Sequence, residues 1–304
     1  MLPVPKRRGD LGSIGVLRFQ AMERYALSGG REGYERLRVL AAARRASTLE
    51  LFRLAGVRPG MRCVDLGCGS GDVTFEMAAL AGPAGSAVGI DMDRAKLAPA
   101  RVAARELGLV NVAFEIGDVN QWHGAGEYDF VYRRFVFQHL ARPVDLLRRM
   151  WEAVRPGGVL AVEDDDLEGL FCDPDNDGFS FYRRSYAEVR ARNGGDPGCA
   201  RRLVRYFREI GISDPAMRML QGISAGGDAK MMPLLTLEAI ADSIVSARLA
   251  SADEIASAIE DLAAFTADPG TTIADPRIFQ VWARRDAGDA AVPQRPAHLR
   301  QEKR

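Results

Sequence analysis

Three glycines alternate along the stretch Val64-Asp65-Leu66-Gly67-Cys68-Gly69-Ser70-Gly71-Asp72. The apolar run before them, 61–66, predicts a buried strand, and the pattern of 72–80 predicts a helix directly after them. Glycine lets the backbone turn sharply and lets a ligand approach it closely. A helix start also offers free N–H groups and the positive end of its dipole. The stretch therefore predicts a ligand crevice at the carboxyl ends of a parallel sheet.

The spacing of these glycines argues against a dinucleotide ligand. The dinucleotide fingerprint is G-x-G-x-x-G, and its last position falls on Asp72 when counted from Gly67 and on Thr74 when counted from Gly69. Asp65 also precedes the first glycine, where a carboxylate suits a cation better than a pyrophosphate. We therefore expect a positively charged ligand group beside Asp65, and a nicotinamide oxidoreductase is disfavoured.

Strand and helix patterns alternate through the first half of the chain. Strands are predicted over 61–66, 87–91, 112–116, 128–132 and 159–163, with helices over 72–80, 94–107 and 143–155. The second of these helices begins after Asp93 as N-cap, ends at Gly108, and should be kinked or shortened by Pro99. Later segments add helices over 179–192, 199–210, 231–249 and 252–266, and strands over 215–222 and 278–284. This alternation predicts the α/β class, with a doubly wound and mostly parallel sheet.

We expect one α/β core with additions at both ends and a late helical insertion. The predicted parts are an N-terminal helical cap (1–57), a core (58–166), the C-terminal half of the sheet (167–285) with a helical substrate lid (230–266), and a disordered tail (286–304). The lid draws on an apolar stretch, 230–235, whose methionines and leucines could line a substrate pocket together with Phe179, Phe181, Tyr182 and Tyr186.

The composition is that of an ordinary globular chain. Of 304 residues, 47% are hydrophobic and 27% charged, and 41 basic residues balance 41 acidic ones. Zero net charge argues against a nucleic-acid partner, and no apolar run is long enough to suggest a membrane partner or a signal peptide. The cysteines Cys63, Cys68, Cys172 and Cys199 lack C-x-x-C spacing and are interpreted as reduced thiols of a cytoplasmic protein. The sequence leaves a homodimer open.

The pattern Asp-x-Gly-x-Gly-x-Gly at 65–71 resembles the first motif of the class I S-adenosylmethionine-dependent methyltransferases. Further marks of that family fall at the predicted strand ends, and together they cover about 58–163: Asp91, Gly117-Asp118-Val119 and Pro156-Gly157-Gly158. The resemblance implies a Rossmann-like sheet of seven strands, in the order 3-2-1-4-5-7-6 with the last strand antiparallel. It also implies S-adenosyl-L-methionine as the cofactor.

The resemblance further implies roles for individual residues. Asp65 and the glycine bend face the methionine part of the cofactor, whose amino group and sulfonium are positive. Asp91 accepts from the ribose hydroxyls, Met92 packs on the adenine, and Asp118 accepts from the adenine amino group. Tyr25, in the cap, could reach the cofactor carboxylate. With Arg133, considered below, the predicted cofactor-binding residues are Tyr25, Asp65, Gly67, Gly69, Gly71, Asp91, Met92, Gly117, Asp118, Val119 and Arg133.

The end of the fourth predicted strand faces the transferred methyl group by topology. Arg133 or Arg134 could there hold the cofactor carboxylate or an acidic substrate group by paired hydrogen bonds. His139 could take a proton from an acceptor hydroxyl or amine, or it could be a packed, hydrogen-bonded histidine. These alternatives stay open from the sequence.

An acidic run, 163–166, follows the fifth predicted strand at the same edge. Glu163 and Asp164 are predicted to assist deprotonation or to bind a cationic substrate, and a solvated acidic loop is the plain alternative. Metal-dependent catechol methyltransferases use acidic residues on these edges, but their full set is not matched, so no metal is predicted.

The sequence thus predicts an enzyme that transfers a methyl group from S-adenosylmethionine to an oxygen or nitrogen of a small molecule. One alternative is a non-catalytic regulatory protein that binds the cofactor. Another is a methyltransferase acting on a protein or a nucleic acid, although no Asn-Pro-Pro-Tyr motif for base methylation follows the fourth strand.

Overall fold

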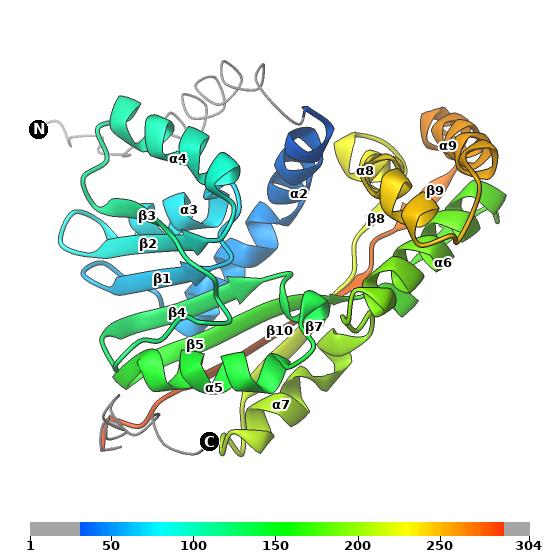
Figure 1. Cartoon of the computed structure of the whole chain (residues 1–304). Coiled ribbons are helices and arrows are strands. Elements are labelled where there is room, and N and C mark those ends of the chain that lie inside the picture. Colours follow the sequence, from blue (N-terminus) through cyan, green and yellow to red (C-terminus); the bar gives the residue numbers. More distant parts are fainter. Residues whose placement is uncertain (1–30, 289–304) are drawn as a thin grey trace, which may run out of the picture.

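A seven-stranded sheet forms the body of the protein in the computed structural model, which describes residues 31–288 and, from residue 40 on, their side chains (Figure 1). The strand order is β3-β2-β1-β4-β5-β10-β7, and β10 runs antiparallel to both β5 and β7. The predicted strand order is therefore confirmed. The strands are β1 (Arg62–Leu66), β2 (Ser86–Asp91), β3 (Val112–Ile116), β4 (Tyr128–Arg134), β5 (Val154–Asp166), β7 (Ala216–Leu220) and β10 (Arg277–Arg284).

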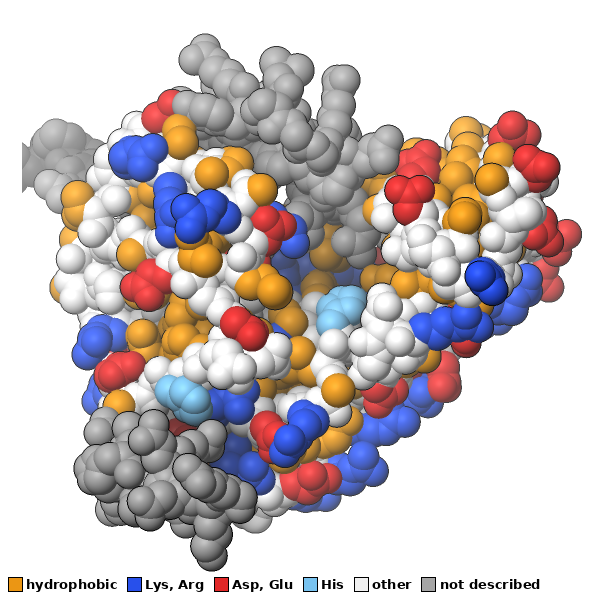
Figure 2. Space-filling model, in the orientation of Figure 1, with side chains coloured by type: hydrophobic (Ala, Val, Ile, Leu, Met, Phe, Trp, Pro, Cys, Tyr) orange, Lys and Arg blue, Asp and Glu red, His pale blue; other side chains and the backbone are white. Residues whose placement is uncertain are grey.

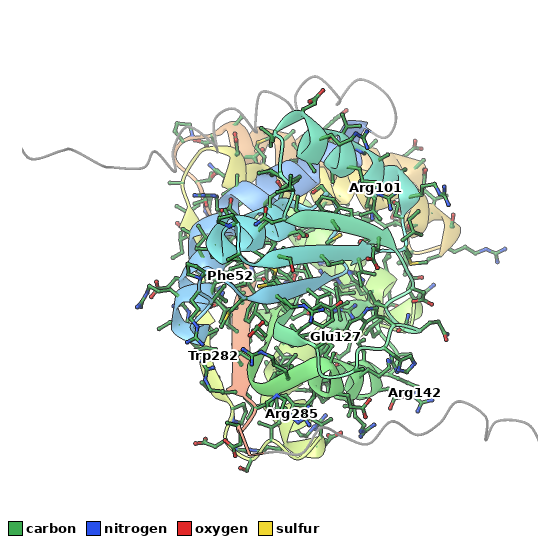
Figure 3. All side chains as sticks on the ribbon, turned by 90° about the vertical axis from the view of Figure 1, so that its left-hand side faces the viewer. Phe52, Arg101, Glu127, Arg142, Trp282 and Arg285 are labelled. Carbon is green, nitrogen blue, oxygen red and sulfur yellow. The ribbon has the colours of Figure 1, made fainter. Side chains whose placement is uncertain are left out.

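Helices cover both faces of the sheet, as a doubly wound fold requires. On one face, α2 (Arg31–Ala55) and α3 (Asp72–Ala81) bury Leu51, Phe52 and Met77 against the strands, and Figure 3 shows Phe52 and Trp282 on this side. On the other face, α5 (Pro143–Ala153) and α7 (Leu203–Glu209) pack on the apolar side of β4 and β5. A further helix, α4 (Arg94–Glu106), packs beside α3 and β3.

A second apolar core lies to one side of the main sheet. The helices α6 (Asp177–Arg192), α8 (Met232–Ser246) and α9 (Ala252–Ala267) pack together there (Figure 1). Beside them is a small sheet of β6 (Phe171–Asp173), β9 (Thr272–Ala274) and β8 (Ile223–Ser224), which our sequence analysis did not predict. The role of 230–266 as a lid stays a prediction. Within the described range, no helix combines the length and apolar character needed to cross a bilayer.

One local prediction about the main elements is wrong and another is settled in part. The helix α4 begins at the Asp93 cap as expected and continues through Pro99 to Glu106, so the proline does not shorten it, and the kink stays a prediction. The strand β5 does not end at Glu163 but runs on to Asp166, so the acidic run is part of the sheet. All four of its carboxylate residues are buried, which excludes the solvated acidic loop.

The bend between β1 and α3 shows why glycines alternate there. Gly71 adopts φ +80°, caps α3, and packs so tightly that an added Cβ would lie 2.5 Å from a ring carbon of Phe114. Gly69 has φ +56°, and an added Cβ would meet nothing within 4 Å. The third glycine therefore serves helix–sheet packing, whereas the second leaves room beside the backbone.

We expect Gly71→Ala to destabilise the fold more than Gly69→Ala does. Both substitutions place a side chain in left-handed backbone, which costs about 1–2 kcal/mol, but only Gly71→Ala adds a clash, which costs a further ~1–3 kcal/mol. Urea unfolding of the two variants measures this difference. Equal losses of unfolding free energy would contradict the packing role given to Gly71.

Candidate active site

A cavity of about 330 Å³ opens at the carboxyl ends of β1, β2, β4 and β5. Its wall also includes residues of α2, α6 and α8, so it lies between the main sheet and the second apolar core. Figure 2 looks into a hollow between these two bodies. The volume falls in the range usual for small-molecule sites, roughly 300–1,000 Å³.

The first half of the cavity is formed by the glycine bend and the tip of β2. Asp65, Gly67, Gly69 and Asp91 line it. The backbone N–H of Gly69 donates to Oδ2 of Asp91 at 2.9 Å, and the N–H of Asp93 donates to Oδ1 at 2.9 Å. A carboxylate oxygen accepts more than one hydrogen bond, so Asp91 keeps acceptor capacity toward a ligand. These four predicted residues therefore meet in one place.

Asp65 is the buried carboxylate at this end of the cavity. Its Oδ2 accepts a hydrogen bond from the Thr74 hydroxyl at 2.8 Å, and only 2% of the residue is exposed. Burial raises the pKa of Asp65 to about 6. A cationic ligand group beside it would favour the charged carboxylate and lower that pKa. The environment of Asp65 thus matches a positively charged partner.

The residues predicted to hold an adenine lie outside this cavity. Met92 is 72% exposed, and neither Met92 nor Gly117, Asp118 and Val119 belongs to the cavity wall. The N–H of Gly117 donates to the carbonyl of Asp91, so this turn adjoins the tip of β2. Asp118 accepts from the N–H of Asn120. Their contacts with a cofactor stay predictions, and Tyr25 lies outside the described residues.

Neighbouring arginines at the end of β4 point to opposite faces of the sheet. Arg134 lines the cavity and donates to the Thr48 hydroxyl of α2 at 3.1 Å. Arg133 is fully buried, lies over the Phe137 ring and is not on the cavity wall, so its selection as a cofactor ligand needs correction. Burial lowers the pKa of Arg133 to about 9, and its guanidinium has no hydrogen-bond partner among the described residues. Arg134 is the arginine that reaches the site.

Each carboxylate of the acidic run has different neighbours, because successive side chains of β5 alternate between its faces. Glu163 accepts from Gln280 at 2.5 Å and from Thr48 at 3.3 Å. Asp165 forms an ion pair with Arg190 at 2.8 Å, and Asp166 forms one with Arg277 at 2.8 Å. Burial raises the pKa of Glu163. Of the four, only Asp165 lines the cavity, so the catalytic roles predicted for Glu163 and Asp164 are not supported by their positions.

Asp164 instead holds the loop that follows β4. Its Oδ2 accepts from the N–H groups of Val136 at 3.1 Å and Phe137 at 2.8 Å, and its Oδ1 accepts from the N–H of Asp165 at 3.0 Å. Burial raises its pKa to about 7. Phe135, directly before this pair of amides, has φ +55°, which is strained for a residue with a side chain. The Asp164 carboxylate therefore fixes a strained turn whose Phe135 side chain lines the cavity.

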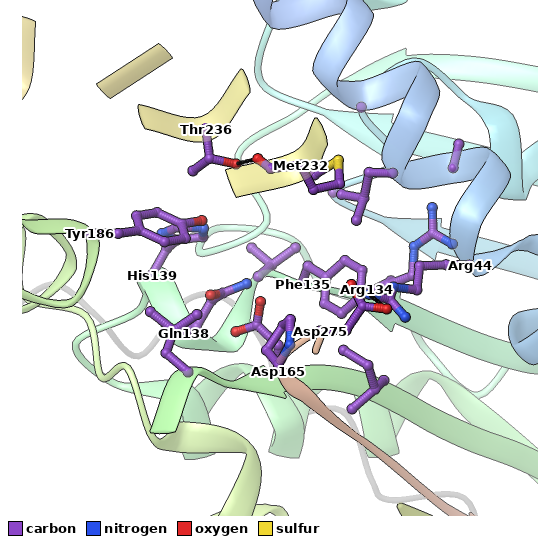
Figure 4. Close-up of a pocket in the computed structure, with 18 of the residues that line it drawn as sticks. Arg44, Arg134, Phe135, Gln138, His139, Asp165, Tyr186, Met232, Thr236 and Asp275 are labelled. Atoms are coloured by element: carbon purple, nitrogen blue, oxygen red, sulfur yellow. Dashed lines mark hydrogen bonds and ion pairs between the residues drawn. The ribbon is translucent and has the colours of Figure 1, made fainter. Parts of the chain in front are cut away.

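The second half of the cavity is formed around Phe135. Figure 4 shows Gln138, His139 and Tyr186 on one side of this ring and Arg134 with Arg44 on the other. His139 is exposed and follows directly on the braced turn, and its predicted role as a base stays a prediction. The sequence analysis marked the acidic run but did not select Asp165 from it. It missed further wall residues, which no motif marked because they come from separate elements: Arg44, Gln138, Arg190, Thr236 and Asp275.

Residues 58–189 match the family model of the methyltransferase domain. The trans-aconitate 2-methyltransferase of Deinococcus radiodurans is 40% identical over 121 residues, which are 40% of this chain and 44% of that protein. The ubiquinone/menaquinone biosynthesis C-methyltransferase of Ectopseudomonas mendocina is 33% identical over 113 residues, which are 36% of this chain and 44% of that protein. The matched stretch thus spans less than half the length of these relatives.

A solved structure agrees with this result at the level of the fold. The crystal structure of a Bacillus halodurans protein assigned as a methyltransferase has a TM-score of 0.54 to this chain at 16% identity, covering 78% of this chain and 98% of that one. The family model over residues 58–189 and the sheet topology are thus both similar to those of class I methyltransferases, the class that uses S-adenosylmethionine.

The described residues fit this cofactor. The open side of Gly69 leaves room for a ligand against the backbone, and Asp91 keeps acceptor capacity next to it. Asp65 and Arg134 add one carboxylate and one guanidinium to the same wall, which are the partners that an amino group and a carboxylate require. An amino acid joined to a nucleoside carries each of these complementary groups.

We expect Asp164→Ala to lower the free energy of unfolding by about 3 kcal/mol or more. The substitution leaves three backbone N–H groups without their acceptor, and each buried unsatisfied donor costs roughly 1–3 kcal/mol. Denaturant unfolding measures the loss, and amide exchange at Val136 and Phe137 should accelerate. Asp164→Asn keeps an acceptor oxygen and should lose less. An Asp164→Ala variant as stable as the wild type would show that the Asp164 carboxylate does not hold the turn that contains Phe135.

Proposed function

We propose that this protein transfers a methyl group from S-adenosylmethionine to an oxygen or nitrogen of a small-molecule acceptor. The observation that carries the proposal is one continuous cavity with two halves. One half contains the glycine bend tied to Asp91, and the other is enclosed by side chains of α2, α6 and α8. A cofactor half that opens directly into an enclosed second half is what a two-substrate transfer requires.

In the cofactor half, each of three charged side chains binds a different group of the cofactor. Asp91 accepts from the ribose hydroxyls, Asp65 faces the amino group, and Arg134 pairs with the carboxylate. The support for Arg134 is its place on the cavity wall near Asp65, whose charge it stabilises. Arg134 is preferred to Arg133 because Arg133 is fully buried and is not on the cavity wall.

When bound, the cofactor supplies a sulfonium carbon that is already electrophilic. The contribution of the protein is then to hold the acceptor atom in line with that carbon and to keep water out. Phe135, on the turn that Asp164 holds, lines the cavity, and Met232 of α8 and Tyr182 of α6 lie on the wall of the acceptor side. His139 is the general base when the acceptor arrives protonated.

The relatives carry names of small-molecule methyltransferases, which supports a small-molecule acceptor here. Their acceptors differ from each other, so no single acceptor follows from them. The alternatives of a cofactor-binding regulator and of a methyltransferase for macromolecules make different predictions. A regulator binds the cofactor without transferring methyl groups, and a macromolecular enzyme is inactive on metabolites.

Calorimetry should show that S-adenosylmethionine binds and that NAD does not. Asp91→Ala should weaken binding of S-adenosylmethionine about tenfold, because a charged hydrogen-bond acceptor is lost. Asp145→Ala, at a half-buried aspartate of α5 that pairs with Arg142 outside the cavity wall, is the matched control and should leave affinity unchanged. Binding of NAD in place of S-adenosylmethionine, or unchanged affinity in Asp91→Ala, would overturn the cofactor assignment.

His139→Ala should lower turnover by about a hundredfold or more while cofactor affinity stays constant, since a positioned base typically contributes at least that much. The measurement is methyl transfer from labelled S-adenosylmethionine across a metabolite panel, with affinity followed separately by calorimetry. Wild-type turnover in the variant would exclude His139 as the base. Absence of transfer to any acceptor by the wild type would favour the regulatory alternative.

A further inference from the structure

We infer that Gln138 selects the acceptor by binding an uncharged hydroxyl group, so that the substrates are alcohols or phenols with an apolar body. This inference rests on the proposed function and names the substrate class of the same site. The observation behind it is a buried amide on the cavity wall with an unused hydrogen-bonding atom.

The Gln138 side chain has an unusual environment for a polar group. Only 2% of the residue is exposed, yet it belongs to the wall of the cavity. Its Oε1 has no hydrogen-bond partner among the described residues. A buried polar atom without a partner costs roughly 1–3 kcal/mol, and such atoms are rare in folded proteins unless a ligand completes them.

The backbone of Gln138 is fixed, so its amide is presented in a defined place. Its carbonyl accepts from the N–H of Asp196 at 3.0 Å, and a side chain at Gly195 would overlap that carbonyl. The preceding amides of Val136 and Phe137 are held by Asp164. Binding a ligand to a preorganised group requires little further ordering, which favours selectivity.

The charged side chains around Gln138 are already neutralised in pairs. Asp165, which lies next to Gln138 in Figure 4, is bound by Arg190 at 2.8 and 3.3 Å. Across the cavity, Arg44 pairs with Asp275 at 2.8 Å. An acidic or a cationic acceptor group would have to displace one member of a buried pair, and breaking such a pair is costly.

An uncharged hydroxyl avoids that cost and matches the amide. A carboxamide offers both an acceptor oxygen and N–H donors, and a hydroxyl group both donates and accepts. This half of the cavity also has apolar side chains on its wall, among them Phe135, Leu170, Met232 and Ile273. A hydroxyl on an apolar or aromatic body is therefore the chemistry that satisfies both parts of the wall.

The test uses three probes that share one ring system: 2-naphthol, 2-naphthoate and 2-naphthylmethylamine. Their binding is measured by calorimetry to the full-length protein saturated with S-adenosylhomocysteine. We expect 2-naphthol to bind about tenfold tighter than either charged probe, which corresponds to one well-formed buried hydrogen bond. Gln138→Leu should abolish this preference, and Gln121→Leu, the same change at an exposed glutamine, should preserve it.

Binding of S-adenosylhomocysteine to the wild type and to each variant is measured first, because it distinguishes a failure of the proposed function from a failure of the role given to Gln138. If neither the wild type nor any variant binds S-adenosylhomocysteine, the proposed function fails. If it binds but a charged probe equals or exceeds 2-naphthol, if 2-naphthol does not bind, or if Gln138→Leu keeps the preference, the role of Gln138 is overturned. Unchanged cofactor affinity in Gln138→Leu shows that any loss belongs to the acceptor half.

Discussion

The hydrogen bond from the Gly69 N–H to the Asp91 carboxylate joins the two parts of the chain on which the cofactor half depends. This hydrogen bond connects the bend after β1 to the tip of β2. It therefore holds the open backbone at Gly69 next to the Asp91 carboxylate. Gly71 makes this approach feasible, because its missing side chain lets Phe114 of β3 pack against the start of α3. The turn therefore places the Asp91 carboxylate beside the open backbone at Gly69 without any further side chain between them.

The acceptor half depends on a different constraint, the extension of β5 beyond the apolar run. Four consecutive carboxylates enter the sheet, and alternation sends each to its own set of donors. Asp164 receives three backbone N–H groups and thereby holds the strained Phe135 turn, whereas Asp165 pairs with Arg190 of α6. The same strand thus joins the main sheet to the second apolar core and encloses the cavity between them.

Periodicity and glycine positions were sufficient to predict the main sheet and the glycine bend, and the family resemblance supplied the strand order. They could not decide which face of a strand a given residue occupies near its end. A shift of one position exchanges Arg133 for Arg134 and Asp164 for Asp165, and in both cases the neighbour of the predicted residue reaches the cavity. The strands β6, β8 and β9 were also missed, because two or three residues carry too little pattern to recognise.

The acceptor half was beyond sequence reasoning for a further reason. Arg44, Asp165, Arg190 and Asp275 come from separate elements, and their charges cancel only because the fold brings each pair together. In the linear sequence they look like four charges that a substrate could use. In the structure both ion pairs are formed, and the Gln138 amide beside them is an uncharged group that no motif marks and whose Oε1 has no hydrogen-bond partner among the described residues. Selectivity in such a site follows from which hydrogen-bonding atoms the fold leaves unsatisfied, and that property exists only after the elements have packed.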